Sequence, residues 1–182
     1  MAKRKKKRKS YLIATISAVI ALFIIYLAFF IIKTSMNKIN QEIDGPYDVV
    51  RVVDGDTFIA EIDEADTYIR LIGIDAPESV ADESYKENTE EGRLASEYLA
   101  NLLEGNRVYL EYDAKLIDNY GRTLCYVYLQ DAETMVNELL LQTGYAQTMT
   151  IEPNVKYRER LLAAEAQAKH AKAGFWSTGF YH

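Results

Sequence analysis

YDVVRVVDGDTFIAEIDEADTYIRLIGID, residues 47–75, is the stretch of sequence that decides the fold. Its first part, residues 47–53, is apolar and β-branched, Asp54-Gly55 is a hairpin-turn signal, and residues 57–62 continue the apolar pattern. Residues 67–74 fit a third strand. The stretch therefore predicts three short consecutive strands joined by tight turns.

The remaining elements follow toward the C-terminus. Residues 90–103 place Leu94, Tyr98 and Leu102 four apart, which predicts an amphipathic helix. Two further strands and two further helices are expected, in that order along the chain, at residues 107–112, 123–129, 135–142 and 154–173. Five strands and three helices predict an α+β protein built on a five-stranded, OB-fold-like Greek-key barrel. A fold of this kind does not by itself assign a function.

An uncharged apolar run occupies residues 11–32. As a helix it would reach roughly 33 Å, which matches the hydrocarbon thickness of a bilayer. A cleaved signal peptide is the alternative, but its apolar core is shorter and ends in small residues, whereas this run ends in Phe29-Phe30-Ile31-Ile32. We therefore expect one N-terminal transmembrane helix that is not cleaved.

Charged residues set the expected orientation of this helix. Residues 3–9 are all Lys or Arg, so residues 1–10 should stay in the cytoplasm and everything after Lys33 should lie outside. Residues 33–46 are expected to form a polar stalk, and residues 47–179 the folded domain. The expected location is the cell membrane, with a single span and an extracellular domain, or the medium if a protease releases that domain.

The part of the chain after residue 33 is acidic. Eight of the 21 Lys and Arg residues lie in the first 33 residues, which leaves 13 basic against 27 acidic residues, a charge of about −14. This charge disfavours a general polyanion-binding protein, because attraction to phosphates supplies most non-specific affinity. Any nucleic-acid function must depend on a few placed cations and a metal ion. The single cysteine, Cys125, excludes an intrachain disulfide and is expected to be a buried thiol.

Three short motifs are the candidates for chemistry. They are Asp54-Gly55-Asp56-Thr57, the segment RLIGIDAPE at residues 70–78, and Asp118-Asn119-Tyr120-Gly121-Arg122. Taken alone, the first also fits an ordinary tight turn and the second an edge strand with charged ends.

The side chains of these motifs suit phosphodiester hydrolysis, which needs an activated water and neutralisation of the charge on the phosphorus oxygens. Asp56 and Asp75 offer hard oxygen ligands that suit calcium or magnesium. Arg70 and Arg122 offer planar forks that bind phosphate oxygens bidentately. Glu78 is the remaining carboxylate and is suited to orienting or deprotonating water.

Together the three motifs resemble the staphylococcal nuclease (thermonuclease) family, in which they recur in this order with compatible gaps. The similarity extends to MVNEL at residues 135–139 and EAQAK at residues 165–169, and it covers residues 47–178. The resemblance implies a calcium-dependent endonuclease, expected to be monomeric, that hydrolyses DNA and RNA and leaves 3′-phosphates.

The resemblance also implies a metal site. Asp56 and Asp75 match the aspartates that bind calcium, and Ala76 matches the position that offers a main-chain carbonyl to the ion. An alanine does not disturb that contact, because the side chain is not the ligand. Asp54 is expected beside the site without binding the ion directly.

For the substrate, the resemblance assigns Glu78 as general base and Arg70 and Arg122 as the arginines that hold the phosphate. Tyr120 matches a residue near the terminal phosphate of the nucleotide. Asn119 departs from the pattern, because the best-known member of the family has a phosphate-contacting lysine there. Residues 148–151 also lack the tyrosines on which that protein stacks a base, at a cost of roughly 1–3 kcal/mol per base. We expect intact chemistry with a weaker or different hold on substrate.

Two other classes of function compete with this prediction. The chain could be a catalytically inactive, nuclease-like module that binds nucleic acid or protein at the cell surface. It could also be a structural surface protein, which would explain the anchor but not the carboxylates and arginines. An inactive module is expected to have lost some of the side chains of the site. All five are present in this chain: Asp56, Arg70, Asp75, Glu78 and Arg122. Catalysis is therefore favoured.

Overall fold

The structure is a computed structural model that describes residues 20, 22–30, 43–78 and 89–182. It comprises two units, residues 1–42 and Ile43–His182. In the first unit, residues 20 and 22–30 are helical. Across the described ranges, no helix combines the length and the apolar character needed to cross a membrane. The predicted basic segment, much of the predicted anchor and residues 33–42 of the predicted stalk lie outside the described residues.

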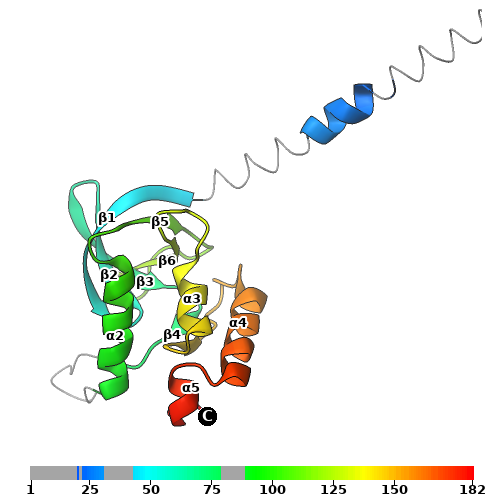
Figure 1. The fold of residues 1–182 in the computed structure, drawn as a ribbon. Coiled ribbons are helices and arrows are strands. Elements are labelled where there is room, and N and C mark those ends of the chain that lie inside the picture. Colours follow the sequence, from blue (N-terminus) through cyan, green and yellow to red (C-terminus); the bar gives the residue numbers. More distant parts are fainter. Residues whose placement is uncertain (1–19, 21, 31–42, 79–88) are drawn as a thin grey trace, which may run out of the picture. The chain divides into compact units, whose positions relative to one another are not determined.

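Five strands of the second unit close into a barrel (Figure 1). They are β1 (Ile43–Asp54), β2 (Thr57–Ile62), β3 (Ala65–Leu71), β5 (Arg107–Glu111) and β6 (Thr123–Tyr128). The order around the barrel is β1-β2-β3-β6-β5, and only β3 and β6 run parallel. The predicted α+β architecture with a five-stranded OB-fold-like barrel is confirmed.

Two strand boundaries differ from the prediction. β1 begins at Ile43, inside the predicted stalk, because Ile43 pairs with Glu111 of β5. The predicted strand over residues 67–74 is interrupted, since β3 ends at Leu71 and Gly73 takes a φ of 80° that favours glycine. Beyond this turn, β4 (Ile74–Asp75) pairs with β7 (Gln147–Thr148) in a second small sheet that was not predicted.

The three predicted helices are present, with α2 at Glu90–Leu103, α3 at Val136–Gln142 and α4 at Arg158–Ala171. Thr89 caps α2 by accepting a hydrogen bond from the main-chain N–H of Gly92 (2.9 Å). α4 begins four residues later than predicted, because a bridge between Ile151 and Asn154 closes a turn first. A single further turn, α5 (Phe175–Thr178), buries Phe175 in the core.

A buried amide ties α3 to the barrel. The Asn137 side chain accepts a hydrogen bond from the main-chain N–H of Val127 (2.9 Å) and donates one to the main-chain oxygen of Ile72 (2.8 Å). Since Ile72 follows β3 directly, α3 holds in place the turn between β3 and β4. Cys125 on β6 is buried and unpaired, as predicted, and burial raises the pKa of its thiol.

Gly55, between β1 and β2, lies where α2 approaches the barrel. A Cβ atom at this position would lie 2.7 Å from the Cβ of Ala76 and 2.7 Å from the Cβ of Ala95. These separations are far shorter than a carbon–carbon contact allows. The missing side chain therefore lets α2, the β1–β2 turn and the segment after β4 meet.

Candidate active site

Arg70, at the end of β3, lies at the centre of the site and is buried. Its Nη2 lies 2.8 Å from Asp56 Oδ2 and 3.6 Å from Asp75 Oδ1. Its Nη1 donates to the main-chain oxygens of Leu71 (2.8 Å) and Ile74 (3.0 Å). The guanidinium therefore brings the two predicted metal-binding aspartates together and also holds the turn between β3 and β4.

Asp56 is the most enclosed carboxylate of the site, with 6% of the residue exposed. Its Oδ1 accepts from the hydroxyl of Thr57 (3.0 Å), and its Oδ2 accepts from the main-chain N–H of Ala76 (3.2 Å). Burial raises the pKa of Asp56, and the charge of Arg70 opposes that shift. The main-chain N–H of Asp56 donates to Asp54 Oδ1 (3.1 Å), which places Asp54 beside the site.

The oxygen donors at this point fit a hard divalent cation. Asp56 and Asp75 both approach the Arg70 guanidinium, and carboxylate oxygens are the ligands that calcium and magnesium prefer. In the described ranges, no group of three His, Cys, Asp or Glu side chains could hold a metal ion. An ion here would therefore take two carboxylates and complete its shell with main-chain oxygens and water. Ala76 is adjacent, and its contact with Asp56 is made by its N–H.

Arg122, at the turn before β6, is the second arginine of the site. Its Nε donates to Asp118 Oδ2 (2.7 Å) and its Nη1 to the hydroxyl of Thr57 (3.4 Å). The Tyr120 ring lies 5.5 Å from the guanidinium carbon and is 86% exposed. Because Thr57 also donates to Asp56, its hydroxyl links Arg122, the predicted phosphate-binding arginine, to Asp56, a predicted metal ligand.

Asp118 closes the turn that carries Arg122. One oxygen accepts from the main-chain N–H groups of Tyr120 (2.8 Å) and Arg122 (2.9 Å), and the other accepts from the Arg122 side chain. Burial alone would raise the pKa of Asp118, but these hydrogen bonds outweigh it and lower that pKa below its usual value. Asp118 therefore fixes the direction of Arg122.

Glu78 lies three residues beyond Asp75, with its side chain exposed. Its main-chain oxygen accepts from the hydroxyl of Thr89 (3.4 Å), the residue that caps α2. The structure thus brings Asp54, Asp56, Arg70, Asp75, Ala76 and Arg122 into one connected cluster, and places Glu78 at the exit from β4.

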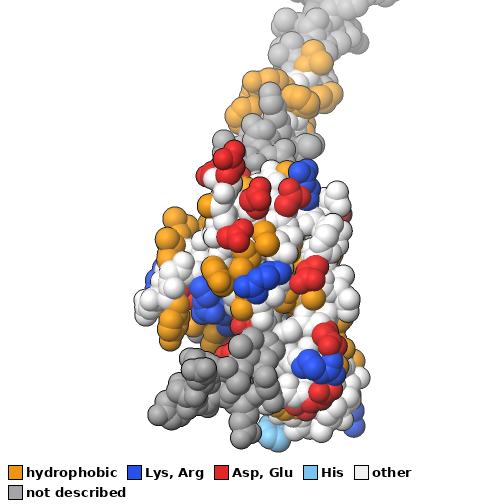
Figure 2. All heavy atoms as spheres, turned by 90° about the vertical axis from the view of Figure 1, so that its left-hand side faces the viewer, with side chains coloured by type: hydrophobic (Ala, Val, Ile, Leu, Met, Phe, Trp, Pro, Cys, Tyr) orange, Lys and Arg blue, Asp and Glu red, His pale blue; other side chains and the backbone are white. Residues whose placement is uncertain are grey.

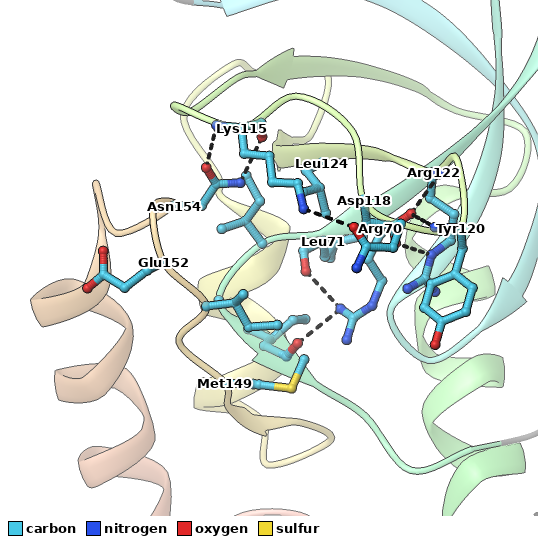
Figure 3. Close-up of a pocket in the computed structure, with 15 residues that line it drawn as sticks. Arg70, Leu71, Lys115, Asp118, Tyr120, Arg122, Leu124, Met149, Glu152 and Asn154 are labelled. Carbon is cyan, nitrogen blue, oxygen red and sulfur yellow. Dashed lines mark hydrogen bonds and ion pairs between the residues drawn. The ribbon is translucent and has the colours of Figure 1, made fainter.

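A pocket of about 210 Å³ lies beside this cluster (Figure 3). Three segments line it: the end of β3 with the following turn, residues 115–124, and residues 149–154. Arg70, Tyr120 and Arg122 are among the lining residues, whereas Asp56 and Asp75 are not. Arg70 therefore faces the pocket while it contacts the aspartates.

Sequence reasoning assigned no role to three residues of the site, Thr57, Lys115 and Asn154. Thr57 stands inside a motif that was recognised, so its position was a usable signal. Asn154 is buried and bonds the main chain of Lys115, 39 residues earlier in the chain. No local pattern indicates such a contact.

The described surface is not broadly basic. Figure 2 shows a face of the molecule on which Asp and Glu side chains alternate with a few Lys and Arg side chains. This face fits the prediction from composition that any attraction to a polyanion depends on a few placed cations.

Comparison with known proteins identifies the family. The model of the family described as staphylococcal nuclease homologues matches residues 68–178. The chain is 42% identical over 134 residues to the thermonuclease of Staphylococcus hyicus, covering 72% of this chain and 75% of that protein. The thermonuclease of Staphylococcus intermedius is 41% identical over 71% of this chain and 75% of its own length. An uncharacterized endonuclease of Escherichia coli O157:H7 is 32% identical over the same shares.

The fold, the site and these relatives define a phosphodiesterase of the nuclease class. The chain belongs to the staphylococcal nuclease family, as its motifs predicted. The prediction of an enzyme is thereby confirmed over that of an inactive module.

Proposed function

We propose that the chain is a calcium-dependent endonuclease that hydrolyses DNA and RNA outside the cell, held at the membrane by residues 11–32. The observation that carries this proposal is the double contact of Arg70. One side of its guanidinium contacts Asp56 and Asp75, and the residue also lines the pocket where a phosphate would enter.

Both arginines keep donors for a phosphate. An arginine carries five N–H groups. Two N–H groups of Arg70 donate to carbonyl oxygens and one to Asp56. One N–H group of Arg122 donates to Asp118 and one to Thr57. The remaining donors are fixed in direction by these contacts, so they can stabilise charge that grows on the phosphorus oxygens without reorganising.

The other groups supply the water and the metal. Glu78, at the exit from β4, is the group suited to orient the attacking water and accept its proton. A calcium ion held by Asp56, Asp75 and the main chain at Ala76 would supply further positive charge next to the phosphate. Attack that expels the 5′-oxygen leaves a 3′-phosphate on one product and a 5′-hydroxyl on the other.

The proposed location at the membrane is supported by the sequence before residue 43. The basic residues 3–9 precede an uncharged apolar run of the length of a bilayer, which favours a cytoplasmic N-terminus and an external nuclease domain.

The decisive assay uses the purified full-length chain in mild detergent with plasmid DNA and with single-stranded RNA. We expect cleavage in millimolar calcium, none in excess chelator, and no effective substitution by zinc. Products should accept a radiolabel at the 5′ end from polynucleotide kinase without prior phosphatase treatment. Equal activity in calcium and in chelator would refute the proposal.

A further inference from the structure

Lys115 lines the pocket and has no role in the chemistry described above. It lies in the segment between β5 and β6, on the same pocket as Arg70 and Arg122. In Figure 3 its side chain reaches across the pocket wall toward the turn that carries Asp118 and Arg122.

Its main chain is fixed by a two-way amide link. The N–H of Lys115 donates to Asn154 Oδ1 (2.7 Å), and its carbonyl oxygen accepts from Asn154 Nδ2 (2.9 Å). Asn154 is 6% exposed, and both hydrogen bonds of this link are partly buried. The main chain at Lys115 is therefore held in place by two hydrogen bonds, unlike that of a lysine on a loop without such contacts.

The Lys115 ammonium group differs from the two arginines in having a neutral partner, whereas each arginine is paired with a carboxylate. Arg70 is paired with Asp56, and Arg122 is paired with Asp118. Within the described part of the chain, no carboxylate lies at ion-pair distance from the Lys115 amine. The amine instead donates to the neutral side-chain oxygen of Asn119 (3.4 Å).

Asn119 is the position at which the family resemblance leads one to expect a phosphate-contacting lysine. The structure puts the Lys115 amine beside that side chain, four residues earlier in the chain. Because the amide of Asn119 carries no charge, it can orient the ammonium group without neutralising it.

We propose that Lys115 binds a phosphate of the substrate strand next to the scissile one, and so supplies the cation that position 119 lacks. This inference rests on the proposed nuclease function. The ligand is a phosphodiester group, and the contact is electrostatic, because an ammonium group is a point charge without the fork of an arginine. Met149 and Ile151 line the same pocket and offer apolar contact in place of stacked rings.

The test compares Lys115→Ala with wild type on a single-stranded DNA oligonucleotide in calcium, using the full-length chain. Loss of one ground-state phosphate contact should raise KM about three- to tenfold and leave kcat within about twofold. The slope of log(1/KM) against log salt should become shallower by about 0.7, the value for one phosphate contact on a single strand. Lys115→Ala keeps the main-chain link to Asn154, so the fold should be retained.

Two further variants make the test specific. Arg51→Ala removes an exposed cation that does not line the pocket, and it should leave KM and the salt slope unchanged. Adding Asn119→Lys to Lys115→Ala should restore most of the lost affinity and slope, since it returns a cation to the same wall.

The outcomes separate the two proposals. No cleavage by wild type in calcium would reject the nuclease function itself. Active wild type together with an unchanged KM and salt slope in Lys115→Ala would overturn the inference alone. A loss confined to kcat would overturn it as well, because that result would place Lys115 in the transition state.

Discussion

Arg70 Nη2 lies 2.8 Å from Asp56 Oδ2, and both side chains are more than nine-tenths buried. Removal of one member of such a pair leaves the other charge buried without compensation, typically at a cost of 3–5 kcal/mol. A cation that binds Asp56 would share the carboxylate with this arginine. The same side chain therefore stabilises the turn between β3 and β4 and fixes the position of a carboxylate that is a predicted metal ligand.

The two arginines should differ in what they contribute to folding. Arg70→Lys and Arg122→Lys should each lower turnover by at least roughly a hundredfold, the effect of losing one transition-state donor. Arg70→Lys should also lower the free energy of unfolding by about 1–3 kcal/mol, because one amine cannot replace its bonds to Asp56, Leu71 and Ile74. Arg122 is less buried, so Arg122→Lys should change stability little. Initial rates and circular dichroism melts measure both quantities, and near wild-type turnover in both variants would refute the mechanism.

Calcium should stabilise the folded protein through Asp75. A free calcium concentration of about a hundred times the dissociation constant raises the free energy of unfolding by about 2.7 kcal/mol. Asp75→Asn should abolish the calcium-dependent rise in Tm, whereas Asp66→Asn, an exposed aspartate on β3, should retain it. Differential scanning calorimetry with and without chelator decides the matter. A full calcium response in Asp75→Asn would mean that the ion binds elsewhere.

Asp118 should make stability depend on pH in the acidic range. Its pKa is lower in the folded protein than the ordinary value of 3.8, so its stabilising contribution is complete above that value and disappears as pH falls through the folded pKa. Asp118→Asn should therefore be less stable than wild type at pH 7, and the difference should shrink below about pH 4. Urea unfolding at pH 7, 5 and 3 gives the comparison. A difference that is constant with pH would contradict the assignment.

The nuclease domain should be accessible from outside the cell. Protease added to intact cells should remove a tag placed after His182 and leave a tag placed before Met1 intact, because the basic residues 3–9 favour the cytoplasm. Cells permeabilised with detergent serve as the control in which both tags are cut. Protection of the C-terminal tag in intact cells would show the opposite orientation.

Local patterns predicted the barrel well because most of its strands are bounded by turn residues and carry alternating or β-branched side chains. The predictions failed where pairing with a distant segment determines the bounds or the existence of a strand. β1 extends to Ile43 because β5 pairs with it, and β4 exists because Gln147 and Thr148 lie alongside it. No signal within residues 43–46 or 72–75 reveals either partner.

The candidate site shows the same division. Asp56, Arg70, Asp75 and Arg122 stand in motifs whose chemistry can be read from residue type, and the structure brings them together. Asn154 holds Lys115 from 39 residues away, and the pairing is visible only after folding. A contact between one side chain and a distant main chain has no sequence period, so pattern analysis cannot find it.

Gly55 was read as half of a turn signal, yet the constraint on it is steric. The residue is not among those with positive φ, so the backbone itself would accept any amino acid. What forbids a side chain is the pair of methyl groups of Ala76 and Ala95, each 2.7 Å from where a Cβ would stand. Asn and Asp, which are also common turn residues, would therefore not fit at this position. The absence of a Cβ at Gly55 therefore sets how closely α2 can approach the segment that begins at Ala76, directly after Asp75.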